Sequence, residues 1–262
     1  MANSPSGESY LDRVMRLLSA LETEPELTPS SLAYEAGLPK STAYRLIDDL
    51  TRRGLLERGA YGRISLGRRL WEMAQSTPLA ATLRQSALPY MEELNTVVQQ
   101  TTQLAVLDGT SVMVVERLSR TGAVENPAEV ASRMPVHLTS MGHAILAFSP
   151  PSAVEDVFRR RGERILSERP QFRAELAEAR RQGYASLDHL IHRNTTGISA
   201  PVPDDTGCAQ AALTVVVPSN SLNVGMYVMA LKTAARGIAA SLGAQRRGAV
   251  HNSRSTGQPV LA

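Results

Sequence analysis

Basic and hydroxyl-bearing residues gather between positions 40 and 63, and these are side-chain types that hydrogen-bond to DNA phosphates and base edges. Within residues 40–69, eight basic residues stand against three acidic ones, a local charge of +5, whereas the whole chain of 262 residues carries a formal charge of only +3. A local excess of this kind suits a polyanionic partner. The candidate DNA-contacting residues are Lys40, Ser41, Thr42, Tyr44, Arg45, Arg52, Arg58 and Arg63.

Most of these residues fall in one predicted helix that begins near Pro39 and ends at Gly54. At ~100° per residue, one side of this helix is apolar and the other is polar. The apolar side carries Ala43, Leu46, Ile47 and Leu50, and the opposite side carries Ser41, Arg45, Asp48 and Arg52. A recognition helix has this division, with its polar N-terminal end against the bases. A solvated surface helix would show the same pattern, so the neighbouring elements must decide between the two.

The elements around this helix favour DNA binding. Helices are predicted over 10–22 and 29–36, and LLER-GAYG-RISL predicts a β-hairpin with a glycine-flanked turn. Two helices, a tight turn, a third helix and a hairpin form a winged helix-turn-helix, here over 8–67. Arg58 and Arg63 then lie at the hairpin, where they reach phosphate or the minor groove or remain exposed charges.

The rest of the chain predicts a second domain over 79–243, joined to the first by a linker helix over 68–78. Its predicted helices cover 79–100, where Pro89 predicts a kink or two abutting helices, and then the segment from about Thr139 to Pro150, 151–161, 170–182 and 224–242. Strand pairs are expected around Asp108-Gly109 and around the DDTG turn, with a loop or irregular strand over 119–134. The expected class is α+β with a mostly antiparallel sheet, and 244–262 is expected to be a disordered tail.

Composition and missing motifs exclude several function classes. A single cysteine, Cys208, rules out a disulfide-stapled scaffold, and no apolar run approaches ~18 residues. The N-terminal residues lack the pattern of a signal peptide, so a soluble cytoplasmic protein is expected. GxxxxGK[ST], HExxH and GxSxG are absent, and neither catalysis nor a cofactor is expected. His189 and His192, with His137 and His143, allow a metal site to be considered, but loop histidines are the simpler interpretation.

Several segments, in this order and spacing, resemble the isocitrate lyase regulator (IclR) family of bacterial transcription factors, up to about residue 243. They are LPKSTAYRLIDDLTRRGLLER, ALPYMEELN, LAVLDGTSVMVVERL, MPVHLTSMGHAILAF, RAELAEARRQGYA and SAPV. The resemblance implies a winged-helix head and an effector domain related to the GAF/PAS-like fold. It also implies dimers or dimers of dimers, operators that are often palindromic, no catalysis, and a small molecule, commonly an organic or aromatic acid, that alters DNA affinity.

Matching the family's effector pocket onto this chain gives Met134, Leu138, Met141, Gly142, Leu187, Gly197, Thr214 and Val216. The chain departs from the common pattern at Leu187, Gly197 and Val216, where polar groups are often found. We therefore expect a more apolar pocket that suits a bulkier, apolar or aromatic ligand, or a degenerate pocket in an effector-independent regulator. A third reading is a ligand-binding or enzymatic domain whose winged head binds proteins.

Overall fold

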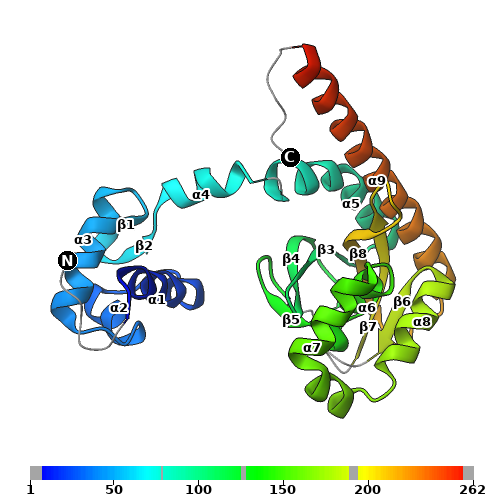
Figure 1. The fold of residues 1–262 in the computed structure, drawn as a ribbon, viewed down its shortest axis with the longest axis horizontal. Helices are drawn as coiled ribbons and strands as arrows, with labels where there is room; N and C mark the ends of the chain where they lie inside the picture. The colour runs from blue at the N-terminus through cyan, green and yellow to red at the C-terminus, as the bar shows by residue number, and fades with distance from the viewer. Residues whose placement is uncertain (1–7, 78, 125–127, 189–193, 256–262) are drawn as a thin grey trace. The chain divides into compact units, whose positions relative to one another are not determined.

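The computed structural model describes residues 8–77, 79–124, 128–188 and 194–255, and the chain divides into two units, Met1–Thr77 and Pro78–Ala262 (Figure 1). The first unit is mostly helical with a small hairpin, and the second packs helices on a six-stranded sheet. The predicted α+β class, with a winged helix-turn-helix head and a mostly antiparallel second sheet, is confirmed.

The first unit follows the predicted order of elements. Its elements are α1 (Tyr10–Thr23), α2 (Pro29–Glu35), α3 (Lys40–Arg52), β1 (Leu56–Arg58), η1 (Ala60–Gly62), β2 (Ile64–Leu66) and α4 (Arg68–Gln75). Ser9 and Asp12 form a capping box at the start of α1. Thr28 caps α2, where Pro29 occupies the first turn and sacrifices no helical hydrogen bond. Local sequence signals therefore set the beginnings of both helices.

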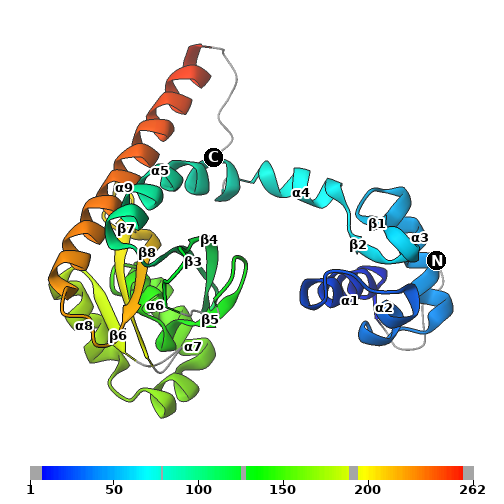
Figure 2. The same ribbon diagram turned by 180° about the vertical axis from the view of Figure 1, so that it is seen from behind.

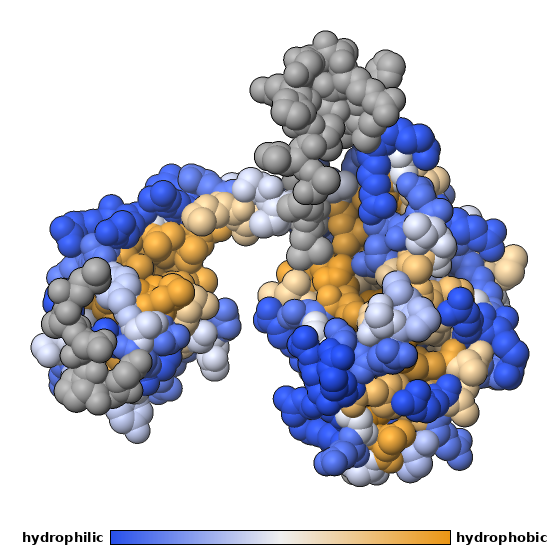
Figure 3. Space-filling view, viewed as in Figure 1, coloured by the Kyte–Doolittle hydropathy of each residue, from blue (hydrophilic) through white to orange (hydrophobic). Residues whose placement is uncertain are grey.

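An apolar core joins the three helices to the hairpin. Leu17 of α1, Leu32 of α2, Ile47 of α3 and Ile64 of β2 are completely buried in it. Leu27 also forms a bridge with Ile64, so the segment before α2 borders the hairpin. The core holds α3 by its apolar side and leaves its polar side outward. Apolar surface remains visible on this unit in Figure 3.

The second unit is built on one antiparallel sheet with the strand order β5-β4-β3-β8-β7-β6. Its strands are β3 (Thr101–Asp108), β4 (Ser111–Leu118), β5 (Arg133–Pro135), β6 (Ala185–Asp188), β7 (Thr195–Pro203) and β8 (Ala209–Pro218). Its helical segments are η2 (Leu79–Arg84), α5 (Gln85–Val98), η3 (Val136–Leu138), α6 (Ser140–Ala147), α7 (Pro151–Glu168), α8 (Phe172–Gln182) and α9 (Val224–Ser255).

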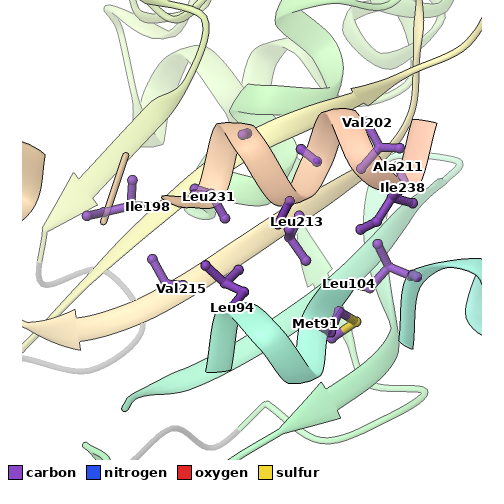
Figure 4. Close-up of a cluster of buried hydrophobic side chains, with 14 of the residues drawn as sticks. Met91, Leu94, Leu104, Ile198, Val202, Ala211, Leu213, Val215, Leu231 and Ile238 are labelled. Carbon is purple, nitrogen blue, oxygen red and sulfur yellow. The ribbon is translucent and has the colours of Figure 1, made fainter. Parts of the chain in front are cut away.

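The two faces of this sheet bury different helices (Figures 1 and 2). On one face, α5 and α9 cover a core shown in Figure 4, which contains Met91, Leu94, Leu213, Val215, Leu231 and Ile238. The other face receives α6, with α7 and α8 packed beyond it. Because side chains alternate along a strand, Leu213 and Val215 point to α5 and α9, whereas Thr214 and Val216 point to the α6 side.

Four features of the second unit differ from the sequence predictions. The helix predicted to end at 161 continues to Glu168, because buried Ile165 anchors the added turns beyond Gly162. Helix α9 continues to Ser255, so the predicted disorder from 244 is wrong for 244–255, a stretch without proline to stop the helix. Strand β6 was not predicted, since four residues leave too little pattern. Two abutting helical segments are present as one of the expected alternatives, but they meet at Arg84, where π-helical η2 gives way to α5, and Pro89 lies inside α5.

Candidate DNA-binding surface and ligand cavity

The N-terminal half of α3 presents a free polar surface. Leu46 and Ile47 are buried, whereas Lys40, Ser41 and Arg45 are exposed. Tyr44 is also exposed, and Thr42 is half-buried at the flank. Within the part of the chain that the structure describes, the Arg45 guanidinium forms no ion pair or hydrogen bond, so all its donors remain available to bases or phosphates.

The second half of α3 carries acids that hold two of the predicted arginines. Arg58 Nη2 lies 2.5 Å from Asp48 Oδ1, and Arg52 Nη2 lies 3.2 Å from Asp49 Oδ1. The Tyr10 hydroxyl donates to Asp49 Oδ2 at 2.7 Å and, as the largest cause, lowers the pKa of that carboxyl. A phosphate that bound Arg52 or Arg58 would have to compete with these carboxylates, whereas Arg45 faces no such competitor among the described residues.

The hairpin adds an exposed aromatic side chain that the sequence analysis did not single out. Tyr61 is completely exposed at the tip, with φ of 58°, a left-handed conformation that is costly for a bulky residue. Arg63 Nη1 donates to the Glu26 carbonyl at 3.3 Å, which ties the base of the hairpin to the segment before α2. The signal for Tyr61 was an aromatic residue between turn glycines, Gly59 and Gly62.

A pocket with about 440 Å³ of empty space, part of it open to solvent, lies between the start of α6, η3 and the sheet. We call it the α6 cavity, and its walls are formed by Gln103, Ala128, Met134, Leu138, Thr139, Ser140, Met141, Leu187, Thr195, Gly197, Thr214 and Val216. The structure thus brings together seven of the eight predicted effector-pocket residues. Gly142 is the exception: a Cβ there would lie 2.1 Å from the Val136 carbonyl oxygen, so this glycine permits close packing of α6 on η3.

Polar side chains from positions outside the predicted set, among them Gln103 and Ser140, also line the α6 cavity. Gln103 is completely buried; its Nε2 donates to the Ala128 carbonyl at 3.2 Å, and its Oε1 accepts no hydrogen bond from the described residues. Ser140 accepts a hydrogen bond from Ser199 at 2.8 Å, and Ser199 is joined to Thr214 at 2.7 Å. The described wall thus combines apolar side chains with several polar ones and no charged one, and a pocket more apolar than is common in the family stays a prediction.

Gly197 sets the depth of the α6 cavity beside Ser140. A Cβ at position 197 would come 2.7 Å from Ser140 Oγ, closer than such atoms approach. The departure from the common family residue at this position thus leaves room for the serine hydroxyl. At this point of the cavity, the polar group is the Ser140 hydroxyl of α6 and not a side chain at position 197 of β7.

Two histidine–carboxylate pairs fix the segment around η3 and α6 against the outer helices. His137 Nε2 lies 2.7 Å from Glu168, and His143 Nε2 lies 2.9 Å from Glu175. Burial is the largest cause that lowers the pKa of His143, so the neutral ring is favoured. His189 and His192 lie outside the described residues, and within those described no group of three or more potential metal ligands is found. The described helices also include none long and apolar enough to cross a membrane.

Comparisons with known proteins identify both units. The profile of the C-terminal domain of the bacterial transcriptional regulator IclR matches residues 78–240, and that of the IclR helix-turn-helix domain matches residues 10–60. The chain belongs to the IclR family. It is therefore a DNA-binding transcription regulator built on the IclR plan.

Individual relatives agree with this assignment. The HTH-type transcriptional regulator KdgR of Escherichia coli is 26% identical over 91% of this chain and 94% of its own length. An IclR homologue from Microbacterium hydrocarbonoxydans, solved in complex with 4-hydroxybenzoate, is 39% identical, with a TM-score of 0.82 over 90% of this chain and all of that one. A second homologue, from a Microbacterium strain, is 38% identical over 90% of this chain and 98% of its own, with a TM-score of 0.55.

Proposed function

We propose that this regulator contacts its operator through the N-terminal half of α3 and the hairpin, and that a small aromatic acid in the α6 cavity controls this binding. The observation that carries the proposal is a cavity with a largely apolar wall and a buried, unpaired acceptor, Gln103 Oε1, in the unit that does not contain the recognition helix. The cytoplasm, where chromosomal DNA lies, is the expected place of action. The proposed role is binding without catalysis.

The walls of the α6 cavity suit a hydroxylated aromatic acid. Met134, Leu138 and Val216 provide apolar surface for a ring. The cavity also meets the N-terminus of the eight-residue helix α6, where backbone N–H groups and the helix dipole favour a carboxylate. Gln103 Oε1 could accept a hydrogen bond from a phenolic hydroxyl at the other end. The 4-hydroxybenzoate complex of the 39%-identical homologue supports this class of ligand.

Calorimetry on the full-length protein tests the ligand class. We expect 4-hydroxybenzoate to bind more tightly than benzoate, since benzoate leaves Gln103 Oε1 unpaired, and we expect Gln103→Leu to remove most of that difference. An acceptor left unpaired costs about 1–3 kcal/mol, so the expected preference is about five- to a hundredfold. Equal affinity for the two acids, or no binding of either, would contradict the proposed ligand.

Gel-shift assays on a duplex selected with the wild-type protein test the coupling. The ligand must change operator affinity by favouring one arrangement of the DNA-binding units over another. We expect 4-hydroxybenzoate to shift the wild-type protein's affinity for this duplex and to leave that of Gly197→Leu, whose side chain fills the space beside Ser140, unchanged. A wild-type protein that binds the acid but keeps its DNA affinity would refute the control mechanism.

We further propose that two copies associate through the first unit and read a palindromic operator. Leu11 and Met15 on α1 and Trp71 on α4 are all at least half exposed, which is unusual for large apolar side chains on a stable monomer. Paired copies would present two α3 helices to two half-sites. We expect Trp71→Glu to shift the mass measured by light scattering toward the monomer, with exposed Tyr34→Glu as the control. An unchanged mass would remove α4 from the interface; whether dimers pair further is read from the same measurement.

A further inference from the structure

The second unit contains another pocket, with about 400 Å³ of empty space that is partly open to solvent, which we call the α7 cavity. Thr110 and Ser111 line it from the turn between β3 and β4, His137 lines it from η3, and Arg161 and Arg164 line it from α7. In Figure 2, α7 runs beside β5, the strand that leads into η3. Arg164 belongs to the turns of α7 that the sequence analysis did not predict, so this combination of residues was not visible from the sequence.

Several polar groups in the α7 cavity have unused hydrogen-bonding capacity. The Arg161 guanidinium and the hydroxyls of Thr110 and Ser111 form no hydrogen bond or ion pair with any residue that the structure describes. Arg164 Nε donates to Glu168 Oε1 at 2.7 Å, which leaves the two Nη groups of the same guanidinium. Donors therefore converge on one small space from two sides.

A buried histidine completes the wall. His137 is only 4% exposed, and its Nε2 is fixed by the carboxylate of Glu168 at 2.7 Å. Nδ1 of the same ring has no hydrogen-bond partner among the described residues. Glu168 thus orients both His137 and Arg164, and the two Nη groups of Arg164 remain available to another acceptor.

The chemistry of this wall selects the class of ligand. Two guanidinium groups repel cations, and arginine side chains can only donate hydrogen bonds. The complementary group is compact, negatively charged and rich in acceptor atoms, and guanidinium groups bind such oxyanions with two parallel hydrogen bonds. We propose that the α7 cavity is a second ligand site, which binds the phosphate or carboxylate group of a small metabolite.

This site is separate from the α6 cavity, although both use one stretch of chain. Met134 and Leu138 face the α6 cavity, whereas Pro135 and His137 face the α7 cavity. The proposal does not depend on which ligand, if any, occupies the α6 cavity. The test of the proposal therefore measures ligand binding in the α7 cavity itself.

Nuclear magnetic resonance of the ¹⁵N-labelled full-length protein provides that test, with the Ser111 amide and the Arg161 Nε as local reporters. Inorganic phosphate and succinate are titrated separately against chloride at constant ionic strength, and the two series distinguish the two kinds of oxyanion. We expect both reporters to shift saturably with at least one of them. We expect Arg161→Gln, followed through Ser111, to weaken that binding about tenfold or more, as for a lost charge-assisted hydrogen bond.

Arg159→Gln is the matched control, because Arg159 is exposed on the same helix, pairs with Asp156 and does not line the cavity. It should leave the affinity unchanged, and Ser111→Ala, followed through Arg161 Nε, should weaken binding without removing a charge. Shifts that fail to saturate, shifts that depend only on ionic strength, or equal losses in Arg159→Gln and Arg161→Gln would each overturn the proposal.

Discussion

Replacing Asp48 by asparagine should strengthen DNA binding, because the change removes the carboxylate that competes with phosphate for Arg58. The two side chains form an ion pair of 2.5 Å and are both substantially exposed. Exposed pairs contribute about 0.2–1 kcal/mol, so Asp48→Asn should lower the free energy of unfolding by less than about 1 kcal/mol. If Arg58 makes an interaction of the same strength with a phosphate, DNA binding at low salt should tighten by about 1.4- to fivefold.

The salt dependence of binding gives a second, independent magnitude. One additional phosphate contact steepens the slope of log K against log salt by about 0.9. Fluorescence anisotropy of a labelled duplex selected with the wild-type protein measures affinity and slope together. Arg58→Gln combined with Asp48→Asn is the control and should lose the gain. An unchanged slope in Asp48→Asn, or weaker binding, would show that Arg58 does not reach phosphate and would refute the reasoning.

Three further outcomes follow from the structure. Arg45→Ala should weaken specific binding by about 1–3 kcal/mol if its free guanidinium contacts a base edge, and equal affinity in a gel shift would exclude that contact. Met91→Ala should lower the free energy of unfolding by about 2–5 kcal/mol in denaturant titrations, because this completely buried side chain lies between α5 and the sheet; a loss below 1 kcal/mol would mean that the core refills the space. The lowered pKa of His143 means that the unfolded chain binds a proton at this ring more readily than the folded chain does. The contribution of His143 to the free energy of unfolding is therefore complete above about pH 6.5 and declines as the pH falls below that value. In His143→Gln the loss of stability with falling pH should be smaller, and a pH profile of unfolding identical to that of the wild type would contradict the lowered pKa.

Much of the DNA-binding unit could be predicted because its signals are local. The apolar and polar sides of α3 follow from the spacing of Leu46, Ile47 and Arg45, and the start of α2 follows from Thr28 before Pro29. The pairing of Asp48 with Arg58 could not be read in this way, because it joins a helix to a strand. The charge count indicated the basic region, but it could not show which arginines form ion pairs and which do not.

The cavities show where local reasoning ends. Gln103 belongs to an apolar strand, and only the packing of that strand beneath α6 shows that its amide faces a cavity. Gly162 suggested that α7 ended early, whereas the buried contact of Ile165 three residues later extends the helix. The resemblance to a known family supplied seven of the wall residues of the α6 cavity but not Gln103 or Ser140, whose place in the wall depends on contacts between segments far apart in this sequence.

Neighbouring residues of the stretch from Met134 to Leu138 line different cavities, with Met134 and Leu138 in the α6 cavity and Pro135 and His137 in the α7 cavity. A ligand in one cavity that displaces this stretch toward the other cavity would change the volume available there. Such coupling between the two sites would need no longer path through the fold. Thermodynamic reciprocity then applies: whatever the first guest does to the affinity of the second, the second does to the first by the same factor. Two ligands could thus together set the affinity of the regulator for DNA.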